Sequence, residues 1–133
     1  MITAIRNAWI VTQDPQRRVL KGDVVVEGDR IISVGQTYNG TADREIDADG
    51  DIVMPGMVNT HTHISMSVMK GVVDDLQFPD FLNKTFRIDS DRTDYDLEVG
   101  TKLGCMEMMR GGTTTFMDLY YSEDVIAKAT QEA

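Results

Sequence analysis

The sequence predicts an α/β protein with a β-rich first part and a second part in which strands and helices alternate. Two observations indicate this division. Residues 1–53 carry short runs of β-branched and aromatic residues, separated by turn residues every few positions. From residue 57 onward the expected order is strand, helical segments, strand and helix, which is typical of parallel α/β folds. We therefore expect two domains, 1–55 and 56–133.

The first part is expected to consist of short strands joined by turns. The segment 2–12 has the β-branched and aromatic composition of a strand. Gly28-Asp29 separates two further strand-like runs, and this arrangement predicts a β-hairpin. The strands expected here are 2–12, 18–20, 23–27, 30–34 and 44–47.

The second part is expected to alternate between strands and helices. Its strongest helix signal covers 94–110, because Thr93 is a fitting N-cap and Gly111-Gly112 follow the last turn. Apolar residues at spacings of three or four predict the buried face of this helix: Tyr95, Val99, Leu103, Met106 and Met109. Gly100 and Gly104 inside it either allow close packing against a neighbour or have no structural role. The other expected elements are strands at 57–63 and 113–119, and helices at 66–73, from Phe78-Pro79-Asp80, and from 123. Phe81, Leu82 and Phe86 are expected to form the apolar side of the helix that starts at Phe78-Pro79-Asp80.

The only two histidines of the chain, His61 and His63, lie at the end of the expected strand 57–63. Side chains alternate between the two faces of a strand, so these two point to the same side. Neutral imidazole is the commonest metal-binding side chain, and zinc accepts it at about 2.0–2.1 Å. The pair is therefore predicted to supply two ligands of one metal ion. The alternative is a pair of surface histidines without a ligand.

Composition excludes several classes of partner. The net charge of −9 argues against non-specific binding to nucleic acid or to an anionic membrane. No apolar run approaches the roughly 20 residues of a membrane span, and residues 1–18 lack the apolar core of a signal peptide. Cys105 is the single cysteine and is expected to be a buried thiol, not a nucleophile. We expect a cytoplasmic protein.

Residues 55–63, PGMVNTHTH, resemble the metal-site signature of the amidohydrolase superfamily. Three further runs resemble the branch that deaminates or dechlorinates nitrogen heterocycles, and they are most similar to the 5-methylthioadenosine/S-adenosylhomocysteine deaminases: 61–66, 70–76 and 112–118. The resemblance implies that 56–133 form the first βα units of a (β/α)8 metal-dependent hydrolase barrel. It also implies that 1–55 are part of a small β-sandwich domain.

The resemblance implies a hydrolytic deamination of a purine-like heterocycle, in which activated water attacks an electron-poor ring carbon and ammonia leaves. The expected metal is zinc, although iron or manganese would accept the same ligands. His61 and His63 would be two ligands, and the remaining ligands and the acid/base residue are expected beyond Ala133. No catalytic residue is therefore expected within this chain. The alternatives in this branch are a guanine deaminase and a triazine chlorohydrolase.

The resemblance also implies substrate contacts. Phe81 occupies the place of a tryptophan that packs near the purine, and the alternative for it is ordinary helix packing. Asp89 is the nearest match to a glutamate that contacts the ribose hydroxyls, and the alternative for it is a solvated loop carboxylate. Asp118 is expected to support the site without binding the metal.

A complete (β/α)8 barrel needs about 250 residues, whereas the part after Gly56 has room for about two or three barrel strands. We therefore expect the chain to be the first part of a longer enzyme. By itself it is expected to be inactive, and to form homo-oligomers or to assemble with the missing portion. The alternative is a catalytically inactive fragment that only associates with itself or with partners.

Overall fold

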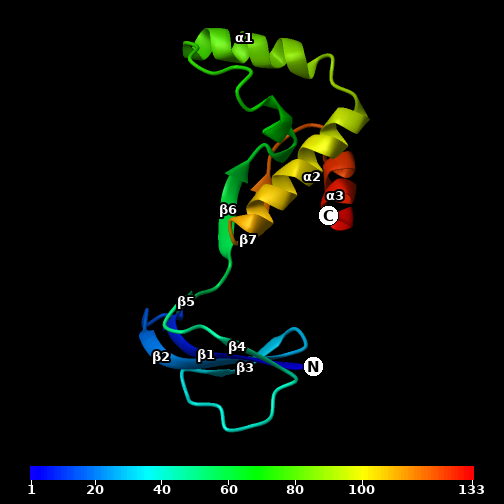
Figure 1. The fold of residues 1–133 in the computed structure, drawn as a ribbon. Helices are drawn as coiled ribbons and strands as arrows, with labels where there is room; N and C mark the ends of the chain where they lie inside the picture. The colour runs from blue at the N-terminus through cyan, green and yellow to red at the C-terminus, as the bar shows by residue number, and fades with distance from the viewer. The chain divides into compact units, whose positions relative to one another are not determined.

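The computed structural model describes all of residues 1–133, which fold into two compact units, Met1–Pro55 and Gly56–Ala133 (Figure 1). Each unit has its own hydrophobic core. The architecture is mixed α/β, as predicted. None of the helices combines the length and the apolar character that a membrane crossing requires.

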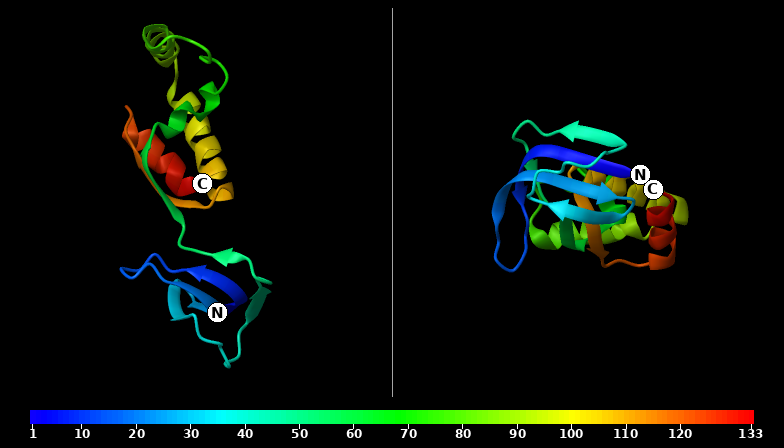
Figure 2. Two further views of the ribbon diagram at one scale, coloured as in Figure 1. Left: turned by 90° about the vertical axis from the view of Figure 1, so that its left-hand side faces the viewer. Right: turned by 90° about the horizontal axis from the view of Figure 1, so that it is seen from below.

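The first unit is a five-stranded sheet in the order β3-β2-β1-β4, with β5 paired to β1. Strands β1, β2 and β3 are antiparallel neighbours, and β4 and β5 run parallel to β1 (Figure 2). The predicted hairpin around Gly28-Asp29 is confirmed. The bounds are β1 Ile2–Val11, β2 Val19–Glu27, β3 Arg30–Val34, β4 Arg44–Asp47 and β5 Ile52–Val53.

The sequence divided β2 wrongly into the two runs 18–20 and 23–27. The structure shows one continuous strand, because Lys21 and Gly22 keep pairing with Trp9 and Ala8 of β1. The core of this unit is formed by the buried residues Ala8, Ile10, Val24 and Ala48, with Ile5, Leu20, Val26 and Val53 packed against them.

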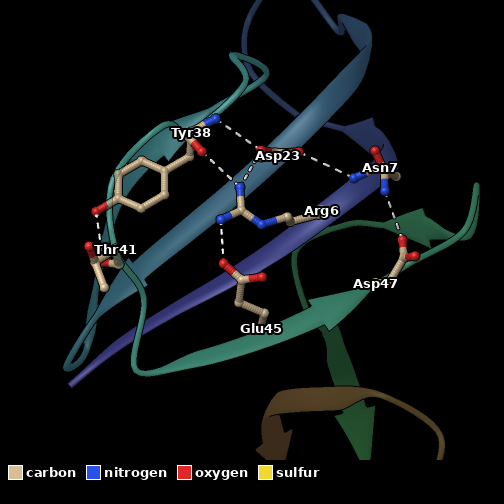
Figure 3. A network of polar contacts seen from close by, with 7 residues as sticks. All are labelled: Arg6, Asn7, Asp23, Tyr38, Thr41, Glu45 and Asp47. Atoms are coloured by element: carbon tan, nitrogen blue, oxygen red, sulfur yellow. Dashed lines mark hydrogen bonds and ion pairs between the residues drawn. The ribbon is translucent and has the colours of Figure 1, made fainter.

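A polar network joins β1, β2, β4 and the loop before β4 (Figure 3). Asp23 is only 5% exposed and accepts hydrogen bonds from the backbone N–H groups of Tyr38, at 2.9 Å, and Asn7, at 3.2 Å. Arg6 lies 3.3 Å from the Asp23 carboxylate and also pairs with Glu45. Asn7 has a φ of 60° at a bulge in β1. The N–H of Tyr38 holds the pKa of Asp23 below its ordinary value.

Replacing Asp23 with asparagine is expected to lower the free energy of unfolding of the first unit by about 2–4 kcal/mol at pH 7, since buried donors and the Arg6 guanidinium lose an ionised acceptor. The folded pKa of Asp23 is lowered, so its contribution is complete above the unfolded pKa of about 3.9 and is lost as the pH falls through the folded pKa. The difference between the variant and the wild type should therefore shrink toward acidic pH. Denaturant unfolding followed through Trp9 fluorescence measures both effects.

The matched control is Asp47→Asn, since Asp47 belongs to the same network but is exposed. Its cost is expected to be far smaller. Equal costs for the two substitutions would contradict the importance assigned to the buried carboxylate of Asp23.

The second unit contains two parallel strands, β6 and β7, with α2 and α3 on the same side of them (Figures 1 and 2). Its core is formed by Ile64, Cys105 and Ile126, with Met108, Phe116 and Tyr120 packed against them. Cys105 is buried, as predicted. The bounds are β6 Met57–Thr62, the 3₁₀ helix η1 Ile64–Met69, α1 Phe78–Asp89, α2 Asp94–Arg110, β7 Thr113–Asp118 and α3 Glu123–Glu132.

Two details of the predicted helices are wrong. The helix expected at 66–73 is the 3₁₀ helix η1, which ends before Gly71, where the φ of 79° is incompatible with a continued helix. Phe86, expected on the apolar side of α1 with Phe81 and Leu82, is 64% exposed. The side chain that α1 does bury is Thr85.

The predicted buried face of α2 is also wrong, although its bounds and its N-cap are confirmed. Thr93 and Asp96 form a complete capping box at the start of the helix. Tyr95 is 72% exposed and Met109 is 57% exposed. The residues that α2 buries are mostly small: Leu97, Gly100, Thr101, Gly104 and Cys105. The reason is that η1 lies so close to α2 that larger side chains cannot fit between them.

Candidate metal centre

The candidate metal centre is built around His61 and His63, called the histidine pair below, at the carboxyl end of β6. Thr62 is partly buried, whereas both histidines are exposed. The centroids of the two imidazole rings lie 5.0 Å apart, with the ring planes at 75°. The two rings are therefore neighbours, as the alternation of strand side chains predicted.

The backbone of Leu119 fixes the orientation of the His63 ring. Nδ1 of His63 lies 2.6 Å from the carbonyl oxygen of Leu119. A carbonyl can only accept a hydrogen bond, so Nδ1 carries the proton in this contact, and in the neutral ring the lone pair is then on Nε2. Leu119 is held in turn by its own N–H, which donates to the carbonyl of Thr62 at 3.1 Å. Metal-binding histidines usually donate their second ring N–H in this way, so the histidine pair fits a metal ion.

Asp118 ends β7 and lies at the same edge, because the parallel strands place Thr62 beside Asp118. Its Oδ1 accepts the N–H of Ile64 at 2.7 Å, which holds the start of η1 directly after His63. Its Oδ2 is buried and makes no hydrogen bond. Burial raises the pKa of Asp118 above its ordinary value. No group of three or more His, Cys, Asp or Glu side chains lies close enough together to hold a metal ion.

Asp89 is connected to His63 through Tyr120. It lies at the end of α1 in an ion pair with Arg92 at 2.9 Å, and the two side chains are only 10% and 5% exposed. It is therefore not the solvated loop carboxylate considered as the alternative. Its Oδ2 accepts the hydroxyl of Tyr120, whose ring centroid lies 5.7 Å from that of His63. Burial, followed by the bond to Asp89, raises the pKa of Tyr120 above its ordinary value.

Phe81 has a different environment. It is partly buried on α1, and its ring stacks on Phe78, with the ring centroids 6.4 Å apart. This stacking lies within one helix and does not connect Phe81 with the histidine pair.

Sequence reasoning missed Arg92, Leu119 and Tyr120. Tyr120 did carry a signal, because it follows β7 at the edge where the carboxyl ends of parallel strands meet. Leu119 acts through its backbone carbonyl, so its side chain gives no indication of the contact. Arg92 precedes an N-cap, a position where an exposed charge is the ordinary expectation.

The chain belongs to the amidohydrolase family, whose sequence pattern matches residues 52–133. The 5'-deoxyadenosine deaminase of Methanosarcina mazei is 43% identical to it over 129 residues, which are 96% of this chain and 30% of that protein. The 5-methylthioadenosine/S-adenosylhomocysteine deaminase of Thermococcus kodakarensis is 41% identical over 134 residues, covering 100% of this chain and 31% of that protein. The chain thus spans less than a third of the length of these relatives.

Solved structures show the same fold. The crystal structure of an adenosine deaminase from Xanthomonas campestris with bound zinc matches with a TM-score of 0.89 and 30% identity, over 98% of this chain and 31% of that one. Guanine deaminase from E. coli matches with a TM-score of 0.69 and 22% identity, over 100% of this chain and 33% of that one, which supports the fold alone.

Proposed function

We propose that the complete natural polypeptide containing these 133 residues, called the parent protein below, is a metal-dependent hydrolase. Its proposed reaction is the deamination of a purine-like nucleoside of the 5'-deoxyadenosine or 5-methylthioadenosine/S-adenosylhomocysteine type. The observation that carries the proposal is the histidine pair, with Nδ1 of His63 bonded to Leu119 and Nε2 left for a metal. The names and identities of the relatives supply the substrate class.

Within the parent protein, Gly56–Ala133 is proposed to form the first βα units of a (β/α)8 barrel, and Met1–Pro55 part of a β-sandwich domain. Support comes from the parallel pairing of β6 and β7 and from their connection through helices. Large apolar side chains on these strands are also exposed: Val58 at 61%, Met117 at 66% and, directly after β7, Leu119 at 66%. Further strands, from the rest of the parent protein or from a partner copy, would cover them.

His61 and His63 are proposed to hold zinc through ring nitrogens, with iron or manganese as the alternative metals. Bound zinc supplies Lewis-acid activation of water at neutral pH. This chain's own contribution is to orient the ligands. The Leu119 carbonyl orients the His63 ring, while the Leu119 N–H and the Asp118 carboxylate hold the backbone before and after His63. The remaining ligands and the acid/base residue are proposed to lie outside these 133 residues.

Phe81 and Asp89 are proposed to contact the substrate. Each carboxylate oxygen of Asp89 has one partner here, Arg92 or Tyr120, and a carboxylate oxygen can accept a second hydrogen bond. A sugar hydroxyl can therefore still donate to Asp89. The partly exposed ring of Phe81 offers an apolar face for the base.

The test is ammonia release by the purified, zinc-loaded parent protein. We expect turnover of 5'-deoxyadenosine, 5-methylthioadenosine or S-adenosylhomocysteine, and much less turnover of guanine. The 133-residue chain alone is expected to release no ammonia, because it supplies only two of the ligands. A zinc-loaded parent protein that releases no ammonia from any of the adenine nucleosides would contradict the proposed function.

A further inference from the structure

A partly buried polar cluster, formed by Asp89, Arg92 and Tyr120, joins the end of α1 to the ring of His63. Asp89 occupies the centre of the cluster, because its two oxygens contact Arg92 and the hydroxyl of Tyr120. Asp89 and Tyr120 are 31 positions apart in the sequence, so the cluster connects the end of α1 with the segment after β7.

Arg92 anchors the cluster to the segment that follows His63. Its Nη2 donates to the carbonyl oxygen of Ser65 at 2.5 Å, and Ser65 belongs to η1. Its guanidinium carbon also lies 5.9 Å from the centroid of the Tyr120 ring, within the range of a cation–π contact. Arg92 therefore holds both the backbone after His63 and the aromatic ring beside it.

Tyr120 and its neighbour Leu119 restrain His63 together. The Leu119 carbonyl accepts from Nδ1 of His63, while the Tyr120 ring packs beside the imidazole at a tilt of 47°. The His63 side chain is otherwise exposed, so these contacts and His61 are what limit the rotation of its ring. The bond to Asp89 fixes the Tyr120 ring, and with it the backbone that carries the Leu119 carbonyl.

We propose that Tyr120, Asp89 and Arg92 are positioning residues for His63, which hold its imidazole as the Nδ1–H tautomer with Nε2 directed toward the metal. This inference rests on the proposed function, in which His63 is a metal ligand. It gives Asp89 a role beyond substrate contact, because Asp89 itself contacts Arg92 and Tyr120. Removing the Tyr120 hydroxyl loosens the ring and weakens metal binding without removing a ligand.

The test compares Tyr120→Phe with Tyr121→Phe in the parent protein. Both variants lose one hydroxyl bonded to Asp89, but Tyr121 donates to the backbone oxygen of Asp89 at 3.2 Å, and its ring stacks on Tyr120 instead of on His63. For Tyr120→Phe we expect zinc binding weakened about 10- to 100-fold, the range for residues that orient metal ligands. For Tyr121→Phe we expect a change of less than about twofold. Competition with a chromophoric chelator measures both affinities.

A second readout does not depend on metal. Nitrogen-15 spectra of histidine-labelled, metal-free protein report the His63 tautomer, with the signal assigned through its loss in His63→Ala. We expect the Nδ1–H form to dominate in the wild type and in Tyr121→Phe, and to mix with the other tautomer in Tyr120→Phe. Unchanged nitrogen-15 shifts together with unchanged zinc affinity in Tyr120→Phe would overturn the positioning role.

Two further measurements keep the inference separate from folding and from the proposed function. If Tyr120→Phe does not fold, Asp89→Asn replaces it, because asparagine keeps an acceptor for Tyr120 but lacks the charge that holds Arg92. Weaker zinc binding and a mixture of His63 tautomers are expected in that variant too. If neither change occurs, the positioning role is overturned. A wild-type parent protein that binds no zinc would instead contradict the proposed function, while the tautomer spectra would still decide whether the cluster positions His63.

Discussion

Replacing His63 with alanine in the parent protein is expected to abolish zinc binding and deamination together. The substitution removes a ligand whose ring is already oriented by the Leu119 carbonyl. Disturbing a residue that only orients a ligand costs about 10- to 100-fold in metal affinity, so the loss of the ligand itself should exceed about 100-fold. Metal content after dialysis and ammonia release from 5'-deoxyadenosine measure the two losses.

His61→Ala is expected to have the same effect, since the two rings are neighbours at one strand end. Thr60→Ala is the matched control, because it removes an exposed polar group from the same strand without removing an imidazole. Zinc content and turnover should survive that change. Deamination that persists in His63→Ala would remove the metal hypothesis.

The histidine pair was predictable because its signal is local. Two metal-binding residues at alternate positions of a strand must lie on one face, whatever the rest of the chain does. The N-cap of α2 was predictable for the same reason, since Thr93 and Asp96 form the capping box between themselves. Strand β2 shows where this local reasoning fails, because pairing with β1 continues through Lys21 and Gly22, the two positions between the predicted runs 18–20 and 23–27.

The environment of Asp89 was not predictable, because it depends on residues far away in the sequence. Arg92 is close by, but Tyr120 comes from the segment after β7. A carboxylate near a helix end is ordinarily solvated, and the sequence contains nothing that reports its burial against an aromatic ring. The contact of the Leu119 carbonyl with His63 was not predictable either, because a backbone carbonyl can accept this hydrogen bond whatever side chain the residue carries.

The buried face of α2 was predicted wrongly because apolar periodicity assumes that large side chains fill the contact. Here the backbone of η1 approaches α2 directly, and small residues permit the approach. A Cβ atom on Gly100 would lie 2.9 Å from the carbonyl carbon of Ser65, and one on Gly104 would lie 3.0 Å from the carbonyl oxygen of Ile64. The two glycines therefore have the packing role that the sequence left open.

Gly100→Ala is accordingly expected to destabilise the second unit by about 2–3 kcal/mol, although alanine is the better helix former by about 1 kcal/mol. The added methyl group meets the backbone of Ser65, which cannot rotate away as a side chain would. Cys105, buried in the same helix, provides the probe. Its rate of labelling by a thiol reagent under native conditions, read by mass spectrometry, reports the free energy of opening of this unit.

Gly111→Ala is the matched control, because its φ of −85° suits any residue and the nearest atom to an added Cβ is the Glu107 oxygen at 3.4 Å. We expect little or no loss of stability there. The Gly100 substitution should also weaken zinc binding, since the Ser65 carbonyl that it displaces accepts the hydrogen bond of Arg92 and follows His63 by two residues. Equal Cys105 labelling rates in the two variants would show that α2 and η1 pack less closely than the structure indicates. The expected effect of Gly100→Ala on zinc binding would then have no structural basis.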